Sequence, residues 1–194
     1  MYNAFSAREV AVNMLAVRAG NPPSAPEMLL RFHRIGQLKH INQMWVTWEK
    51  WFAELEESHT SLSPLVFFRS PSPDQSWVST SGAVLDAAAL YLSALDYPPS
   101  PEAMLCIRAG YLSLQRIAKL FRIHFEINPK YPDFPISISR DQFETAVKLF
   151  ADQGIPIKKS MDQAWQDFAG WRVNYDSVLI ELSELTMAPT IIWF

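Results

Sequence analysis

Glu56 and His59 are the residues whose types and spacing come nearest to metal chemistry. They belong to the segment Glu56-Glu57-Ser58-His59, and a glutamate and a histidine three residues apart share one face of a helix. Carboxylate-bridged di-iron bundles combine two such segments with carboxylates from other helices. This sequence contains no second segment of that kind, and its other histidines have no spacing typical of metal ligands. We therefore interpret the segment as an acidic helix end, with a metal site at Glu56 and His59 as the alternative.

No motif indicates nucleophilic catalysis. A serine or cysteine nucleophile needs a neighbouring base, and the sequence holds neither a Gly-x-Ser-x-Gly elbow nor a cysteine-histidine signature. Loops that hold phosphate groups draw on glycine for close backbone approach, and the chain has only six glycines. We therefore predict a protein that is not an enzyme and that uses no cofactor.

Asp86 is a carboxylate within an apolar helix. Its neighbours from Gly82 to Leu90 are otherwise small or apolar, so the helix is expected to bury it. A buried carboxylate needs a cation, or its pKa shifts until it is neutral. The candidate cations are Arg108, Arg116 and Arg172, each flanked by apolar residues. We favour a structural ion pair over a ligand site.

Arg69 and Trp77 flank a proline-containing segment at the start of the same helix. Ser76 or Asp74 can cap that helix, which is the plainer interpretation. The alternative is that Arg69, Trp77 and the helix N-terminus bind an acidic ligand or a partner segment, because the helix dipole favours negative charge there.

Aromatic residues are concentrated between Gln37 and Ser58. Apolar side chains recur there at steps of three and four residues, which predicts an amphipathic helix. The chain has seven tryptophans, more than a core of this size requires. These rings either belong to the core or face a ligand or another subunit. We call the candidate surface the aromatic face and define it as Trp45, Trp48, Trp51 and Phe52.

Composition excludes several classes of protein. The net charge is -3 with no run of four basic residues, which argues against nucleic acid as a partner. The single cysteine, Cys106, cannot form an internal disulfide and fits an apolar helix core. No signal peptide is indicated, and the longest apolar stretch, Gly82 to Leu95, is too short to cross a bilayer.

Helix start and stop signals divide the chain clearly. Capping boxes are predicted at Ser6, Ser139 and Ser160, and Ser100 precedes a proline at a first helical position. The predicted helices span residues 6–20, 24–36, 37–58, 76–95, 100–123, 140–153 and 161–187. The pair at 76–95 and 100–123 is expected at the centre of the core.

These elements predict an all-α fold, an irregular multi-helix bundle of about six to seven helices. We expect one domain over residues 1–194. A proline-rich segment from Phe125 to Ile138 would join two sub-lobes, residues 1–125 and 139–194, if it divides that domain.

Four long strings give the sequence a resemblance to a known family. They are Trp48 to Thr60, Phe68 to Trp77, Ala83 to Ala89 and Asp167 to Tyr175. In these strings, and across almost its full length, the chain resembles the cytoplasmic C-terminal region of bacterial two-transmembrane, potassium-channel-like proteins. No pore helix and no Thr-Val-Gly-Tyr-Gly filter string is present, so the pore module is absent from this chain.

The resemblance implies a non-enzymatic cytoplasmic domain, at the inner face of the membrane, that assembles with its own copies and biases channel opening. We expect a homo-oligomer formed through helices, with the aromatic face supplying the contact. The alternative is a small-molecule sensor. Its pocket would lie between the Trp-rich helix and the helices that carry Asp86, Arg108 and Arg172.

Overall fold

The computed structural model describes residues 1–189 and 193 and is all-α over them. Eight α-helices and two short 3-10 helices follow one another, and no strand occurs in the described residues. The helices are α1 (Tyr2–Ala19), α2 (Ala25–Arg34), α3 (Asn42–Ser61), α4 (Trp77–Ala94), α5 (Pro101–Leu120), α6 (Arg140–Asp152), α7 (Met161–Arg172) and α8 (Asp176–Thr186), with η1 (Leu38–His40) and η2 (Ser63–Phe67). The predicted multi-helix bundle is confirmed, with slightly more helices than expected.

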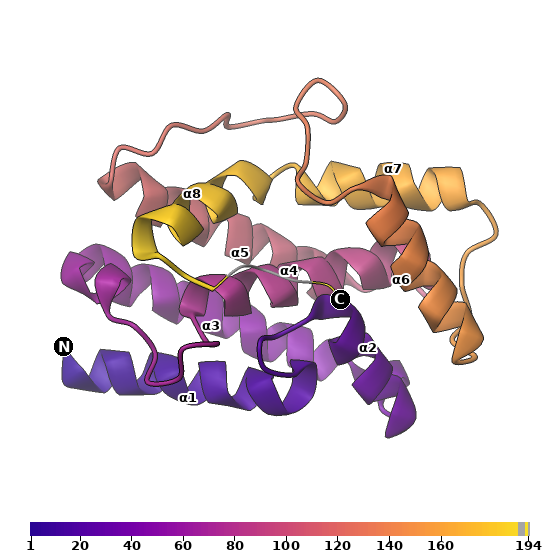
Figure 1. Cartoon of the computed structure of the whole chain (residues 1–194), viewed down its shortest axis with the longest axis horizontal. Coiled ribbons are helices and arrows are strands. Elements are labelled where there is room, and N and C mark those ends of the chain that lie inside the picture. Colours follow the sequence, from indigo (N-terminus) through magenta and orange to yellow (C-terminus); the bar gives the residue numbers. More distant parts are fainter. Residues whose placement is uncertain (190–192, 194) are drawn as a thin grey trace.

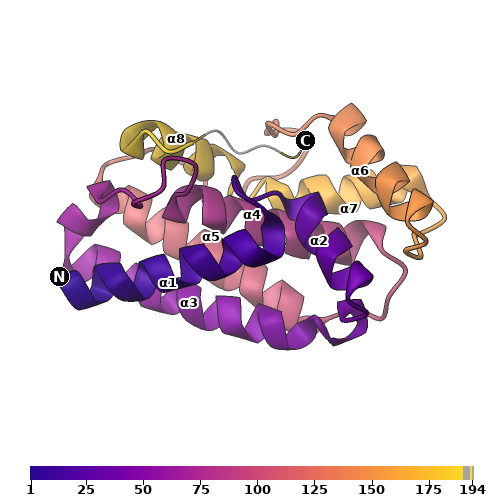
Figure 2. The ribbon, with the colours of Figure 1, turned by 60° about the horizontal axis from the view of Figure 1, so that its bottom comes forward.

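Helix α4 lies at the centre of the bundle. Every one of its residues except Leu92 is buried, because its alanines, serines and Gly82 let neighbouring helices approach on all sides. Helices α2, α5 and α7 pack against α4, and α3 packs along α5. Figure 1 shows α1 and α3 below this centre and α7 and α8 above it. Figure 2 shows α1 running along the outside of the bundle.

Gly110 sets the separation between α4 and α5. A Cβ atom at this position would overlap the side chain of Leu85 and press against the ring of Phe52. The absent side chain therefore allows α5 to contact α3 and α4 at once.

The helix caps follow the sequence signals at most starts. Ser24, Ser76, Ser100 and Ser160 each accept a hydrogen bond from a backbone N–H of the first turn, and Ser139 forms the full predicted capping box. The capping box predicted at Ser6 is wrong, because α1 already begins at Tyr2. At Ser160 only the serine half of the predicted box forms, and the side-chain amide of Gln163 donates to Asp167 instead.

The predicted helix over 161–187 is also wrong, because the structure has two helices there. Helix α7 ends at Arg172 and α8 begins at Asp176. The side-chain amide of Asn174 donates to the carbonyl oxygens of Gly170 and Trp171, so it replaces helical N–H groups at the end of α7. This break turns both Arg172 and Asp176 toward the interior.

One hydrophobic core runs through both predicted sub-lobes. It includes Leu15 and Trp45 from the first part of the chain, and Phe143 and Leu179 from the last part. The proline-rich segment contains no helix and passes over the outside of the bundle (Figure 1). Cys106 is buried in this core, and burial raises the pKa of its thiol. Among the described residues, no helix combines the length and the apolar character needed to cross a membrane.

Candidate functional site

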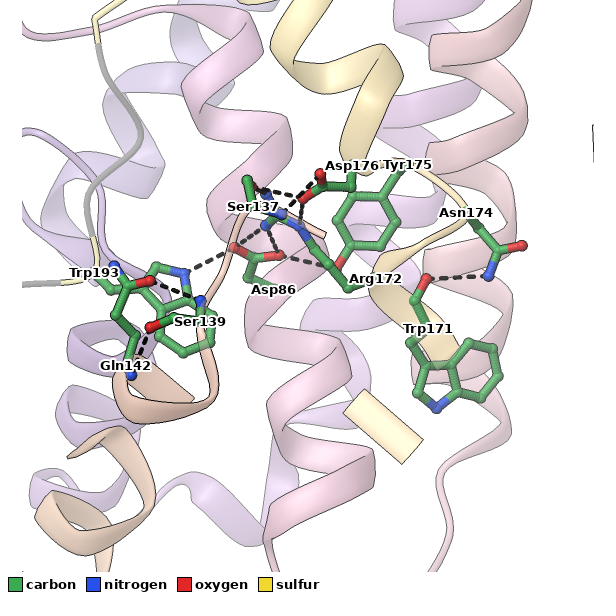
Figure 3. Close-up of polar contacts among 10 residues, drawn as sticks. All are labelled: Asp86, Ser137, Ser139, Gln142, Trp171, Arg172, Asn174, Tyr175, Asp176 and Trp193. Carbon is green, nitrogen blue, oxygen red and sulfur yellow. Dashed lines mark hydrogen bonds and ion pairs between the residues drawn. The ribbon is translucent and has the colours of Figure 1, made fainter. Parts of the chain in front are cut away.

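The carboxylate of Asp86 lies at the centre of a buried polar cluster (Figure 3). Nη1 of Arg172 forms an ion pair with both of its oxygens. The hydroxyl of Tyr175 donates to Oδ1 and the indole Nε1 of Trp193 donates to Oδ2, both at 2.9 Å. Asp86 therefore receives donors from three other residues, which compensate for its removal from water.

Arg172 continues this cluster to a second carboxylate. Its Nε donates to Oδ1 of Asp176 at 2.6 Å, and its Nη2 donates to the hydroxyl of Ser137 at 3.1 Å. The backbone N–H and hydroxyl of Ser137 donate to Asp176 at 3.0 and 2.7 Å. The guanidinium thus joins α4, α7, α8 and the end of the proline-rich segment.

The electrostatics of the cluster keep the guanidinium of Arg172 charged. Burial alone would lower the pKa of Arg172, but Asp86 and Asp176 raise it above its ordinary value. Burial and Asp86 raise the pKa of Tyr175 well above its ordinary value, so its hydroxyl remains a donor. Since each ionised group already has partners, the arrangement is suited to holding helices together rather than to proton transfer.

The predicted ion pair of Asp86 is therefore present, and Arg172 is its cation. The other two candidates lie elsewhere. Arg116 pairs with Glu56 at 2.7 Å, and exposed Arg108 donates to the hydroxyl of Tyr111 at 3.1 Å. The structure does not bring Arg108 to Asp86 and Arg172, so these residues form no common pocket of the kind expected for a sensor.

The aromatic face is not exposed. Trp45 and Phe52 are 0% exposed, and Trp48 and Trp51 only 4% and 6%. The expectation that these rings form the surface between subunits is wrong, because α3 turns them toward α5 and the core. Only Trp48 and Trp51 reach a surface feature, the groove described below.

Glu56 and His59 do not converge on a metal site. Glu56 binds Arg116 and accepts from Ser113, whereas His59 is fully buried. Burial, with the nearby charge of Arg8, lowers the pKa of His59 to about 3. The neutral ring bonds the carbonyl of Leu55 through Nδ1 at 2.9 Å and Arg8 through Nε2 at 3.2 Å. No group of three or more potential metal ligands occurs in residues 1–189 and 193.

Arg8 is an anchoring residue that the sequence analysis missed. It is 3% exposed, and it donates to the carbonyls of Leu65 at 2.9 Å and Phe68 at 2.6 Å. It also pairs with Glu9. These bonds fix the connector after α3 against α1. The signal in the sequence is the pair of charged residues Arg8 and Glu9 within an otherwise apolar helix. The capping box predicted at Ser6 includes these two residues, so their burial is not expected from it.

Trp77 has a structural role at the start of α4, close to Arg69. Trp77 is buried and its Nε1 donates to the carbonyl of Val66 at 3.1 Å, while Ser76 caps α4. Arg69 is exposed, and the two residues line a cavity of about 100 Å³. That volume is small for the acidic ligand considered from the sequence.

The outer side of α1 has an unusual distribution of residues. Val10, Met14 and Val17 are 58%, 41% and 76% exposed, whereas the charged Arg8 and Glu9 are buried. The exposed positions of this helix therefore carry no charge, and Arg18 at its end is only partly exposed. We call Val10, Met14 and Val17 the α1 face.

A groove lies beside the α1 face. Helices α1 and α3 form its walls, and its volume is about 420 Å³. Val10 and Met14 line one side, and Met44, Trp48 and Trp51 line the other. Three charged residues also line it: Arg18, Lys50 and Glu54. We call it the α1–α3 groove. It joins the exposed apolar side chains of α1 to the edges of two buried tryptophans.

Comparison with known protein families, with curated proteins and with solved structures gives no match. The structure provides an ionic cluster with satisfied hydrogen bonds inside the bundle, and an apolar helix face with a groove on its surface.

Proposed function

We propose that this chain is a non-enzymatic assembly or regulatory domain that associates with its own copies through the α1 face. The observation that carries this proposal is a second apolar stripe on α1, which stays exposed while Val12, Leu15 and Ala19 face the core together with the charged Arg8 and Glu9. A surface helix normally exposes polar and charged side chains on the side opposite its buried stripe. An apolar face rimmed by polar residues is typical of a protein contact.

The spacing within α1 suits a contact between two helices. Val10, Met14 and Val17 lie at positions i, i+4 and i+7, so they form one continuous stripe. In a two-fold dimer the same patch meets itself, and like charges on it would repel. The α1 face has no charges, which favours self-pairing. The α1–α3 groove gives the partner's α1 a recess against Trp48 and Trp51.

The resemblance to cytoplasmic regions of potassium-channel-like proteins gives this assembly a role. A self-associating domain on the cytoplasmic side of a membrane changes the equilibrium of an attached pore when its contact differs between open and closed states. A difference of about 1–3 kcal/mol is enough for such coupling.

A second candidate function uses the same groove for a small apolar ligand. Its volume lies within the range of ligand pockets, and methionine and tryptophan line it. This is the sensor alternative, moved from Asp86 to the α1–α3 groove. It predicts a monomer whose stability rises with ligand.

Light scattering on size-exclusion fractions tests the proposal across a range of protein concentration. The wild-type chain is expected to form a dimer, and Val10→Glu combined with Val17→Glu is expected to give a monomer, because two carboxylates enter the self-paired stripe. Leu105→Glu is the matched control, because Leu105 is 50% exposed on α5, away from α1. A wild-type monomer at all concentrations would contradict self-association and favour the ligand-binding alternative.

A further inference from the structure

A second concave surface lies between α5, α7 and the loop after α4. Its volume is about 690 Å³, and it shares no lining residue with the α1–α3 groove. Four large aromatic residues line it, together with two exposed prolines: Tyr91, Tyr97, Tyr111, Trp171, Pro98 and Pro99. We call it the aromatic cleft. Figure 3 shows that the indole of Trp171 points away from the Asp86 cluster.

The wall of the cleft formed by the loop after α4 is held in place from both sides. The rings of Tyr91 and Tyr97 stack with centroids 5.8 Å apart. The N–H of Asp96 donates to the carbonyl of Pro156, and the N–H of Lys158 donates to the carbonyl of Ala94, both at 2.9 Å. The cleft is therefore formed before any ligand arrives, which limits the entropic cost of binding.

The free polar groups of the cleft are mainly hydrogen-bond donors. The ring of Tyr91 is largely buried, and its hydroxyl is not among the buried atoms without a partner, so it is open to the cleft that it lines. Burial, Tyr97 and Glu102 raise the pKa of Tyr91, so this hydroxyl keeps its proton. The hydroxyl of Tyr111 accepts from Arg108 and keeps its own proton to donate. Both hydroxyls can therefore donate to an acceptor that enters the cleft.

One carboxylate borders these aromatic groups. Oδ1 of Asp167 accepts from Gln163 at 2.8 Å, which leaves its other oxygen available. At the opposite wall Nζ of Lys158 donates to the carbonyl of Leu92 at 2.6 Å and keeps its positive charge and two further N–H donors. The cleft thus offers aromatic faces, hydroxyl and ammonium donors, and one charge of each sign at separate walls.

We propose that the aromatic cleft binds an extended proline-rich peptide segment that carries a basic residue. A polyproline II segment has no internal hydrogen bonds, and its prolines lack N–H groups, so it presents mainly carbonyl acceptors. The free tyrosine hydroxyls and the indole N–H of Trp171 complement those acceptors. Proline rings pack on aromatic side chains in this mode of recognition. Asp167 lies where it can pair with the basic residue.

Gly170 gives a direct way to block the cleft without disturbing the fold. It lines the cleft on α7, and a Cβ atom at this position meets nothing within 4 Å. Leucine at this position would project into the cleft beside Trp171 and Asp167, whereas alanine would add only one methyl group. Both replacements raise the helix propensity of α7. The matched pair is therefore Gly170→Leu and Gly170→Ala.

The test uses a synthetic peptide that begins with arginine and continues with repeated Ala-Pro-Pro triplets. Calorimetric titration of the full chain with this peptide measures binding. NMR spectra of the tryptophan indoles, recorded in parallel, show which tryptophan the peptide contacts. The wild-type chain is expected to bind this peptide and to shift the indole signal of Trp171. A comparison peptide with every proline replaced by alanine is expected to bind at least about tenfold more weakly. Gly170→Leu is expected to weaken binding at least about tenfold, and Gly170→Ala to leave it within about twofold.

Asp167→Asn and Tyr91→Phe test the two polar contributions separately. Asp167→Asn should weaken binding and reduce its dependence on salt, since one ion pair is lost. Tyr91→Phe keeps the ring and removes one donor, so it should weaken binding without changing the thermal midpoint. The proposal is overturned if neither calorimetry nor NMR detects binding of the proline peptide, if the alanine peptide binds equally, or if folded Gly170→Leu binds as the wild type does.

Discussion

Asp86 and Arg172 lie 86 positions apart in the chain, and both are buried where they form an ion pair. The pair joins α4, from the first half of the chain, to the end of α7. Tyr175 and Trp193 add donors to the same carboxylate. Removing either charge leaves the other one buried without its main partner, so the two residues act as one unit.

Replacing Asp86 alone is expected to cost about 3–5 kcal/mol of unfolding free energy, because Arg172 loses its closer carboxylate in the interior. The double replacement Asp86→Ala with Arg172→Met should cost less than the sum of the two single ones, since Asp86 and Arg172 are then removed together and neither is left without the other. Asp176 loses Arg172 in both Arg172→Met and the double variant, so this loss does not affect the comparison. Guanidinium unfolding of the four proteins gives the coupling. Asp133→Ala, at an exposed loop position, is the control and should stay within about 0.5 kcal/mol. Additive losses would show that the two charges do not interact.

Trp193 secures the C-terminal end of the chain to this cluster. It is 3% exposed, its ring lies 5.4 Å from that of Phe168, and its carbonyl accepts from Ser24. Trp193→Ala is expected to cost about 3–5 kcal/mol, and Trp193→Phe less, because the ring is largely kept and only the bond to Asp86 is lost.

Added indole should raise the thermal midpoint of Trp193→Ala and not that of the wild type, because the variant alone has a vacant site beside Asp86. Benzene is the matched additive, since it fills space without donating a hydrogen bond. Equal effects of indole on both proteins would show that the ring of Trp193 does not occupy a formed cavity.

His59 makes stability depend on pH. Its pKa is lowered to about 3 in the folded state, against about 6.5 in the unfolded chain, so the unfolded state binds more protons between these values. Stability is therefore fully present above about pH 6.5 and falls as pH decreases toward 3, by at most about 1.4 kcal/mol per pH unit. His59→Gln should flatten this slope between pH 5 and 7, where carboxylates contribute little. Chemical unfolding at several pH values measures it, and parallel slopes for the two proteins would exclude His59 as the cause.

Periodicity and capping predicted most of the fold. The Ser139 box and the serine caps of α2, α4, α5 and α7 depend on a few neighbouring residues, so the sequence displays them directly. The sequence pattern does not show the break between α7 and α8, because Asn174 ends the helix through a hydrogen bond of its side chain. The break is also stabilised by the burial of Arg172 and Asp176, which occurs only in the assembled bundle.

The candidate site was predicted in part for the same reason. An aspartate in an apolar helix implies a buried cation, and Arg172 was among the three named. Which arginine it is depends on tertiary packing. The aromatic face was assigned to the surface because periodicity shows that residues share a side of a helix, but not which side faces the core. Which side of α1 is exposed depends on how α1 packs against α2, α3 and α4, and the sequence alone does not show this packing.

Gly110 provides a final prediction, based on a close approach of helices. Gly110→Ala is expected to destabilise the fold by about 1–3 kcal/mol, because the new methyl group overlaps Leu85 and presses on Phe52, and this outweighs the gain in helix propensity. Gly170→Ala is the matched control, since its methyl group meets open space, and it should leave stability unchanged or raise it by up to about 1 kcal/mol. Urea unfolding compares the two variants. Equal changes in both would mean that α5 can move away from α4 without cost, and that Gly110 does not set their separation.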